Sequence, residues 1–356
     1  MHGPMIPDLR TWIPEDTISF TDPASFRETI STLLKAKSLG NVRTTIGTSE
    51  HGRALDVFHF GRGPVKVVLM AGAHSDEPVG PETLRMLCHF FAQFPDQFDD
   101  LLGEFQFFIF PHINPDGEAV NWRWIKEWPD IKSYLAHSFR EEPGRDMEFG
   151  YPSLRKENRL ISDYLREHAP FELHLNLHGM AYSEGAMLLI DKYWAGRSEW
   201  LQNAFVRMVR SLELPLHDHD RKGEKGFHYL GPGLSTTPES GKMRRHFLEQ
   251  DDEKTASLFH MNSMEYIRSI SSDPMSLVTE LPLFHVKHAP HETHQRGIPG
   301  AYLSFKERVP KLKALIEQGR PLDEDLDSFI ITPFPLYAAV RIQLGLLERA
   351  LEFIRK

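Results

Sequence analysis

Apolar residues in this chain form short continuous runs, separated by stretches in which apolar positions recur every three or four residues. The run at residues 65–70 is apolar at all but one position, which is typical of a strand buried on both faces of a sheet. Further runs that predict strands occupy residues 104–110, 171–178, 186–190 and 275–279. Helical spacing predicts helices between Asp22 and Gly40 and at residues 81–94, 154–167 and 198–212. Strands that alternate with helices predict an α/β fold: a mixed, largely parallel central sheet with helices on both faces.

The remaining segments complete the outline of the chain. Residues 43–61 alternate around turn residues and are expected to form a hairpin. Residues 213–276 are polar and irregular, and a segment of this length without clear structure usually carries function or forms a lid. A final helix is indicated by one apolar stripe, which comprises Val340, Leu344, Leu347, Leu351 and Ile354. We therefore expect a main domain at residues 1–290 and a C-terminal helical extension, residues 291–356, that packs on it.

Composition narrows the class of protein. A chain of 356 residues can form one large domain with a small appendage. Its net charge of −9 argues against a nucleic-acid partner, which usually requires a basic face. The single cysteine, Cys88, excludes an internal disulfide and fits a reducing compartment. The N-terminal residues do not resemble a signal peptide, and no apolar stretch is long enough to span a membrane. We expect a cytoplasmic protein without a membrane partner; its oligomeric state is open.

Polar residues with metal-binding chemistry follow several of the expected strands. His74 and Glu77 come after the first run, His178 closes the run at 171–178, and Glu280 follows the run at 275–279. Ligands of parallel sheets bind outside the carboxyl ends of the strands, so we expect these side chains to lie together. Two imidazoles and one carboxylate are a ligand set for a catalytic zinc that keeps one position open. The pattern predicts one Zn²⁺ per chain, bound by His74, Glu77 and His178, with Glu280 as a general base.

Other histidines are weaker candidates for metal binding. His174 is expected deeper in its strand than His178 and is interpreted as a core residue. The sequence His217-Asp-His-Asp220 has charged, turn-like flanks and is interpreted as a solvated loop. A third group, spaced by three residues, could bind adventitious metal or line the mouth of a cleft; it comprises His285, His288, His291 and His294.

Taken together, these segments resemble the zinc carboxypeptidase family, the carboxypeptidase A-like enzymes. The resemblance rests on Ile46-Gly-Thr-Ser-Glu-His-Gly-Arg53, residues 67–80, Asn114-Pro-Asp-Gly117, Leu175-Asn-Leu-His178 and Thr279-Glu280. It implies a carboxypeptidase-like sheet, one zinc, and hydrolysis of a C-terminal peptide bond or a related amide. It also implies that Glu280 takes a proton from zinc-bound water, and that Arg123 polarises the scissile carbonyl.

The resemblance is weakest at the residues that would bind substrate. The family's Asn-Arg pair, which grips the substrate's terminal carboxylate, is absent in its usual form. Arg145 lies in the corresponding region and is a candidate for a bidentate grip on a carboxylate. Lys156-Glu-Asn-Arg159 imitates the pair but has helical periodicity. For the family's tyrosine that closes over the substrate, Tyr266 is favoured over Tyr229.

Three functions fit these patterns. The first is a zinc hydrolase of carboxypeptidase type that acts on a peptide or a peptide-like amide. The second is a deacylase of N-acyl amino acids, resembling succinylglutamate desuccinylase or aspartoacylase. The third is a relative that binds peptides without turnover. The intact ligand set and Glu280 favour the first two, and Asn114-Pro-Asp-Gly117 with the long chain favours the first. The sequence does not identify the substrate.

Overall fold

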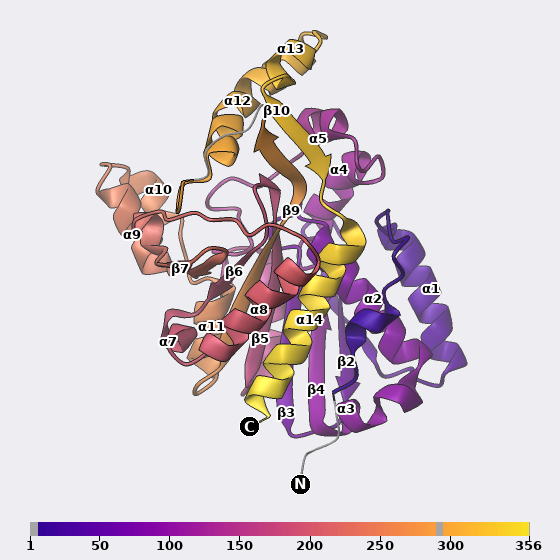
Figure 1. The fold of residues 1–356 in the computed structure, drawn as a ribbon. Coiled ribbons are helices and arrows are strands. Elements are labelled where there is room, and N and C mark those ends of the chain that lie inside the picture. Colours follow the sequence, from indigo (N-terminus) through magenta and orange to yellow (C-terminus); the bar gives the residue numbers. More distant parts are fainter. Residues whose placement is uncertain (1–5, 290–294, 356) are drawn as a thin grey trace.

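A computed structural model describes residues 6–289 and 295–355. In this part of the chain, ten strands form one sheet in the order β1-β2-β4-β3-β5-β9-β6-β8-β7, and β10 pairs with β9 (Figure 1). The strands are β1 (Arg43–Thr48), β2 (Ala54–Gly61), β3 (Val65–Ala71), β4 (Phe105–Phe110), β5 (Leu173–Ser183), β6 (Met187–Ile190), β7 (Tyr229–Gly231), β8 (Leu234–Thr236), β9 (Met275–His288) and β10 (Phe329–Pro333). The central strands β4, β3, β5 and β9 are parallel, whereas β1, β2, β6, β7 and β10 each make antiparallel pairs. The sheet is therefore mixed, with a parallel centre, as predicted.

Helices cover both faces of this sheet. On one face, α2 (Val79–Gln93), α8 (Glu199–Ser211) and α14 (Leu336–Ile354) pack together (Figure 1). On the other face lie α6 (Lys156–His168) and α11 (Ser263–Ile270). The side chains of β3 alternate between the two cores: Val67 and Leu69 join the first, Val68 and Met70 the second. This explains the continuous apolar run in the sequence, because both faces of the strand are buried.

Shorter elements connect these layers. The further helices are α1 (Pro23–Ala36), α3 (Asp99–Glu104), α4 (Pro115–Ile125), α5 (Ile131–His137), α7 (Lys192–Ala195), α9 (Ser240–Leu248), α10 (Glu253–Ser257), α12 (Gly300–Glu317) and α13 (Asp323–Leu326). Single 3-10 turns are η1 (Leu9–Trp12), η2 (Pro95–Phe98) and η3 (Glu224–Gly226). No helix among the described residues has both the length and the apolar content that a membrane span needs.

Two expectations from the sequence need correction. Residues 213–276 are not one irregular segment, because they contain β7, β8, α9, α10 and α11. The strand expected at 275–279 runs on to His288, because its second half pairs with β10 and with the end of β5. Glu280 therefore lies inside β9, and His178 lies inside β5, rather than at strand ends.

The C-terminal part of the chain contributes to the same core and sheet. α14 packs against α2, α8 and β5, and β10 extends the sheet beside β9. α12 packs on α5 and on β9. The boundary at residue 290 stays a prediction.

Candidate active site

The turn between β3 and α2 brings the first two candidate ligands against β5. His74 and Glu77 lie in this turn, and α2 begins two residues after Glu77. The helix approaches β5 so closely that a Cβ at Gly80 would lie 2.2 Å from the carbonyl oxygen of Leu177. Glycine therefore allows the turn to reach the strand that carries His178.

His74, Glu77 and His178 form the one group among the described residues in which three or more metal-ligating side chains converge, with ligand atoms within 4.8 Å of one another. The two Glu77 oxygens lie 2.9 Å from His74 Nδ1 and 3.0 Å from His178 Nδ1. The two Nδ1 atoms are 3.2 Å apart. The backbone N–H of Gly179 also donates to Glu77, at 3.1 Å. Three ligand atoms therefore point at one small volume.

The far nitrogens of both histidines face carboxylates. His74 Nε2 lies 3.6 Å from Asp146, and His178 Nε2 lies 3.4 Å from Glu148. Glu148 is itself held by Asn176 and Ser263, each of which donates to it at 2.9 Å. A carboxylate beside Nε2 keeps the N–H on that atom and leaves the Nδ1 lone pair for a cation. The donor set and its orientation therefore fit zinc.

The charged groups of this cluster shift one another's pKa values. Burial would lower the pKa of His178, but Glu77 and Glu148 outweigh it and raise that pKa to about 10. Burial would raise the pKa of Glu77, but His74, Arg140 and His178 hold it well below its usual range. A bound dication would replace the imidazole protons, because metal ligands must be deprotonated.

Glu280 stands beside these residues. In the parallel pairing of β5 with β9, it lies opposite His178, so the two side chains leave the same face of the sheet. Its side chain is half-buried and lines the same cavity as His74 and Glu77. Burial, followed by the charge of Glu77, raises the pKa of Glu280 to about 7. This carboxyl group is therefore able to exchange a proton near neutral pH.

Arg140 is the cation closest to the group. Its Nε donates to Asp76 at 2.8 Å, and its Nη2 donates to Glu77 at 2.5 Å. The side chain remains 44% exposed and lines the cavity. Its Nη1 makes no hydrogen bond to a described residue. The two N–H groups of Arg140 Nη1 can therefore donate to a ligand.

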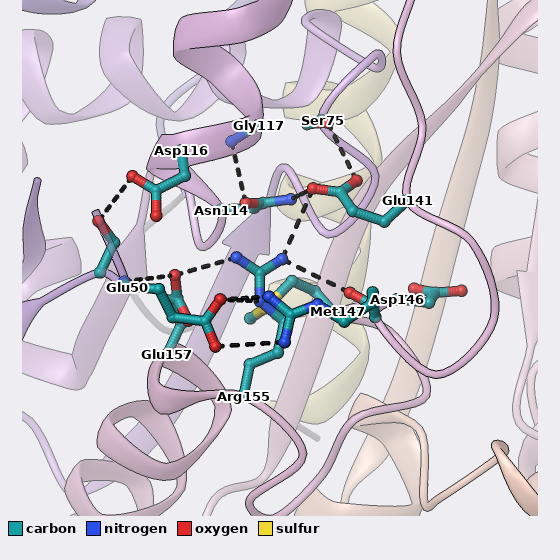
Figure 2. Close-up of polar contacts among 12 residues, drawn as sticks. Glu50, Ser75, Asn114, Asp116, Gly117, Glu141, Asp146, Met147, Arg155 and Glu157 are labelled. Atoms are coloured by element: carbon teal, nitrogen blue, oxygen red, sulfur yellow. Dashed lines mark hydrogen bonds and ion pairs between the residues drawn. The ribbon is translucent and has the colours of Figure 1, made fainter. Parts of the chain in front are cut away.

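A buried polar network holds the segment that carries Arg140, Asp146 and Glu148. Figure 2 shows Arg155 among acidic side chains and Glu141 beside Asn114. Arg155 lies 3.0 Å from Glu157 and 3.5 Å from Glu141. Glu141 accepts from Asn114 and, at 3.2 Å, from Ser75, the residue next to His74. The network ties residues 139–149 to the turn with the candidate ligands.

The cavity in front of these residues has a volume of about 680 Å³. His74, Glu77, Arg140 and Glu280 line one part of it. Other walls come from β5, from α9 and its neighbouring loops, and from α12. The volume falls within the range of small-molecule and peptide side-chain sites.

The structure brings together four of the seven site residues predicted from the sequence, namely His74, Glu77, His178 and Glu280. Arg123 does not join them: it is exposed on α4 and is not among the cavity-lining residues. The structure therefore does not support its role at the scissile carbonyl. Arg123 lies on the exposed side of α4, whereas Arg140 lines the cavity.

The two residues expected to bind substrate lie elsewhere. Arg145 is exposed and pairs with Glu50, so its guanidinium is already engaged outside the cavity lining. Tyr266 is 2% exposed, donates to the carbonyl oxygen of Ser162 at 2.7 Å and stacks on Tyr151. It lies on the buried face of α11. The tyrosines that line the cavity are Tyr134, Tyr182 and Tyr302.

The other histidines also differ from expectation in part. His174 is buried as expected. His217 and Asp218 are buried rather than solvated, because Tyr302 packs over His217. His291 and His294 lie outside the described residues.

Sequence reasoning missed Arg140, Asp146 and Glu148. Arg140 follows α5 in a polar segment without periodicity, so no pattern marked it. Asp146 and Glu148 lie on either side of the buried Met147 in a segment of turns and bends, so no helical or strand pattern marked them.

Comparisons with known proteins agree with this geometry. The family model described as zinc carboxypeptidase matches residues 33–192, which include all three candidate ligands. Carboxypeptidase B of Astacus astacus is 25% identical over 133 residues, which are 35% of this chain and 44% of that protein. The match therefore spans less than half of this relative.

One of the solved structures compared shows the same fold. Thrombin activatable fibrinolysis inhibitor aligns with a TM-score of 0.51 at 11% identity, over 98% of this chain and 82% of that chain. Carboxypeptidase A from Helicoverpa armigera aligns with a TM-score of 0.49 at 14% identity, over 97% of this chain and 77% of that one. We conclude that residues 33–192 of this chain match the zinc carboxypeptidase family, and that the His74, Glu77 and His178 group lies within this match.

Proposed function

We propose that the chain is a zinc-dependent hydrolase of a peptide or peptide-like amide bond, of carboxypeptidase type. The observation that carries the proposal is that His74, Glu77 and His178 converge, and that His74 and Glu77 line one cavity together with Glu280 and Arg140. The family match supports it. Such a site contains a ligand set, a proton acceptor and a fixed cation, which together suffice for hydrolysis.

His74, Glu77 and His178 would hold the zinc, one ion per chain. When bound there, zinc supplies a Lewis acid that activates water and polarises a carbonyl oxygen. Asp146 and Glu148 keep the imidazoles oriented for this purpose.

Glu280 would accept the proton of the attacking water and return it to the leaving nitrogen. A carboxyl group with a pKa near neutrality is suited to both transfers. Arg140 would stabilise the negative charge that develops on the carbonyl oxygen, through the N–H groups that Asp76 and Glu77 leave free. These roles require that Arg140 and Glu280 lie on the same cavity, as they do.

A peptide panel tests the proposal. Zinc-supplemented protein is incubated with short peptides that have free or amidated C-termini, with and without a chelator, and the products are identified by mass spectrometry. We expect chelator-sensitive hydrolysis. Release of the last residue from free C-termini alone would establish an exopeptidase, and cleavage of amidated peptides would indicate a broader amidase. If zinc-loaded protein cleaves nothing in a broad panel, the hydrolase proposal fails and the peptide-binding alternative is favoured.

A further inference from the structure

The walls of the cavity differ in charge. The part that carries the candidate ligands and residues 138–146 is acidic, with Asp76, Glu77, Glu141, Glu142, Asp146 and Glu280. Two other segments that line the cavity supply cations instead. Residues 221–227 contribute Arg221 and Lys225, and α12 contributes Lys306 and Lys313. Neither of these two segments contributes a carboxylate to the cavity lining, so the positive charge is grouped on their side of the cavity.

These cations are largely without acidic partners. Among the described residues, no carboxylate lies within 4.0 Å of a side-chain nitrogen of Arg221, Lys306 or Lys313; Lys225 reaches only its neighbour Glu224, at 4.0 Å. Lys313 donates to the hydroxyl of Ser138 at 3.3 Å. Unpaired positive charge on a concave surface attracts anions.

Aromatic rings support two of the cations. The Arg221 guanidinium carbon lies 4.0 Å from the centroid of the Phe227 ring, and Lys306 Nζ lies 5.8 Å from that of Tyr302. The Tyr302 ring packs edge-on against His217, with centroids 4.9 Å apart. His217 is 1% exposed, and neither of its ring nitrogens has a hydrogen-bond partner among the described residues. The Tyr302 ring is therefore backed by a buried side chain, as expected of a preformed wall.

Arg221 and Lys306 act on the same place. The pKa of His219 is lowered to about 4, first by burial and then by Arg221 and Lys306, which outweigh the opposite effect of Glu224 and Asp220. The His219 ring also packs against Tyr302, with centroids 5.8 Å apart. A cation from the loop and a cation from α12 therefore both act on one imidazole, which is itself uncharged at neutral pH.

We propose that Arg221, Tyr302 and Lys306 form an anion subsite that binds a carboxylate of the substrate. The substrate class would then be acidic peptides or N-acyl amino acids, with the carboxylate at the chain terminus or on a side chain. The substrate class rests on the proposed hydrolase function. The binding of a carboxylate by these residues rests on the cavity alone.

Three small probes test the subsite. N-acetyl-Gly-Gln carries only a terminal carboxylate, N-acetyl-Gly-Glu amide carries only a side-chain carboxylate, and N-acetyl-Gly-Gln amide is neutral. Their dissociation constants are measured by calorimetry on the full chain after chelation, because a bound cation would itself attract carboxylates. We expect at least one anionic probe to bind about tenfold or more tightly than the neutral probe. The probe that does so identifies the source of the carboxylate.

Variants assign the preference to residues. The double variant Arg221→Gln/Lys306→Gln should lose it. The control Lys311→Gln should keep it, since Lys311 lies on α12 outside the cavity lining and pairs with Asp325. Circular dichroism spectra of all three proteins check that they are folded.

Two results would overturn the subsite: equal binding of all three probes by the wild type, or an undiminished preference in the double variant. Neither depends on turnover. A chain that cleaves no peptide but prefers anions through Arg221 and Lys306 loses the proposed function and keeps the subsite. A chain that cleaves acidic and neutral peptides equally, without an anion preference in binding, keeps the function and loses the subsite.

Discussion

Replacement of Arg140 separates its proposed catalytic role from its structural one. Its Nε and Nη2 are engaged by Asp76 and Glu77, and Nη1 has no partner among the described residues. Arg140→Gln therefore removes the free cationic donor from the cavity together with the ion pairs to Asp76 and Glu77, so zinc content must show whether the metal site is intact. Loss of a single donor to a developing oxyanion costs about 2.7–4 kcal/mol in transition-state binding, which is about 10²- to 10³-fold in rate. We expect kcat/KM to fall by this amount, most of it in kcat.

Arg123→Gln is the matched control, because it removes the same group from an exposed position outside the cavity lining. It should change kcat/KM by no more than about twofold, a typical result for an exposed surface residue. Both variants are assayed on a peptide that the wild type cleaves, and zinc is measured in each preparation. The reasoning is refuted if fully zinc-loaded Arg140→Gln retains more than a tenth of the wild-type kcat/KM, or if Arg123→Gln loses as much activity.

Further predictions follow from single contacts. Glu280→Gln should abolish hydrolysis while zinc binding remains. In the wild type, kcat/KM should fall as the pH drops through a value at or below about 7, because Glu280 acts as a base only when it is deprotonated. An active glutamine variant would contradict this. Arg155→Leu should lower the free energy of unfolding by about 3–5 kcal/mol in urea titrations, since it leaves the fully buried Glu157 unpaired. Adding Glu157→Leu should restore much of that loss, and a double variant no more stable than the single one would disprove the pairing. Gly80→Ala should cost about 1–3 kcal/mol by the same titration, because its Cβ would meet the Leu177 carbonyl; wild-type stability would mean that α2 moves freely.

The sequence was most informative where the local pattern and the tertiary fold coincide. The run at 65–70 predicted a central strand because β3 is buried on both faces. The rule that ligands bind beyond parallel strands grouped His74 with His178 and Glu280 correctly, although β5 and β9 continue past the last two residues. The side chains of His178 and Glu280 still lie together because β5 pairs with β9 at this point, with His178 opposite Glu280.

Other positions depend on contacts between residues far apart in the chain, which the sequence pattern does not show. His217 is followed by the charged residues Asp218 and Asp220, and its burial depends on Tyr302, which is distant in the chain. Arg140 follows a short helix in a segment without periodicity, so only tertiary contacts with Asp76 and Glu77 show its position. Arg123 has the charge needed to polarise a carbonyl, but its position on α4 leaves its side chain exposed.

A cytoplasmic location stays a prediction.

The central claim is that His74, Glu77 and His178 bind a catalytic zinc. Elemental analysis of the purified chain beside His178→Ala tests it most directly, after both proteins have been supplied with zinc and dialysed. The account predicts one zinc per chain in the wild type and almost none in the variant, because removing one of three protein ligands weakens a zinc site severely. A wild type that takes up no zinc, or a variant that retains as much as the wild type, would contradict it.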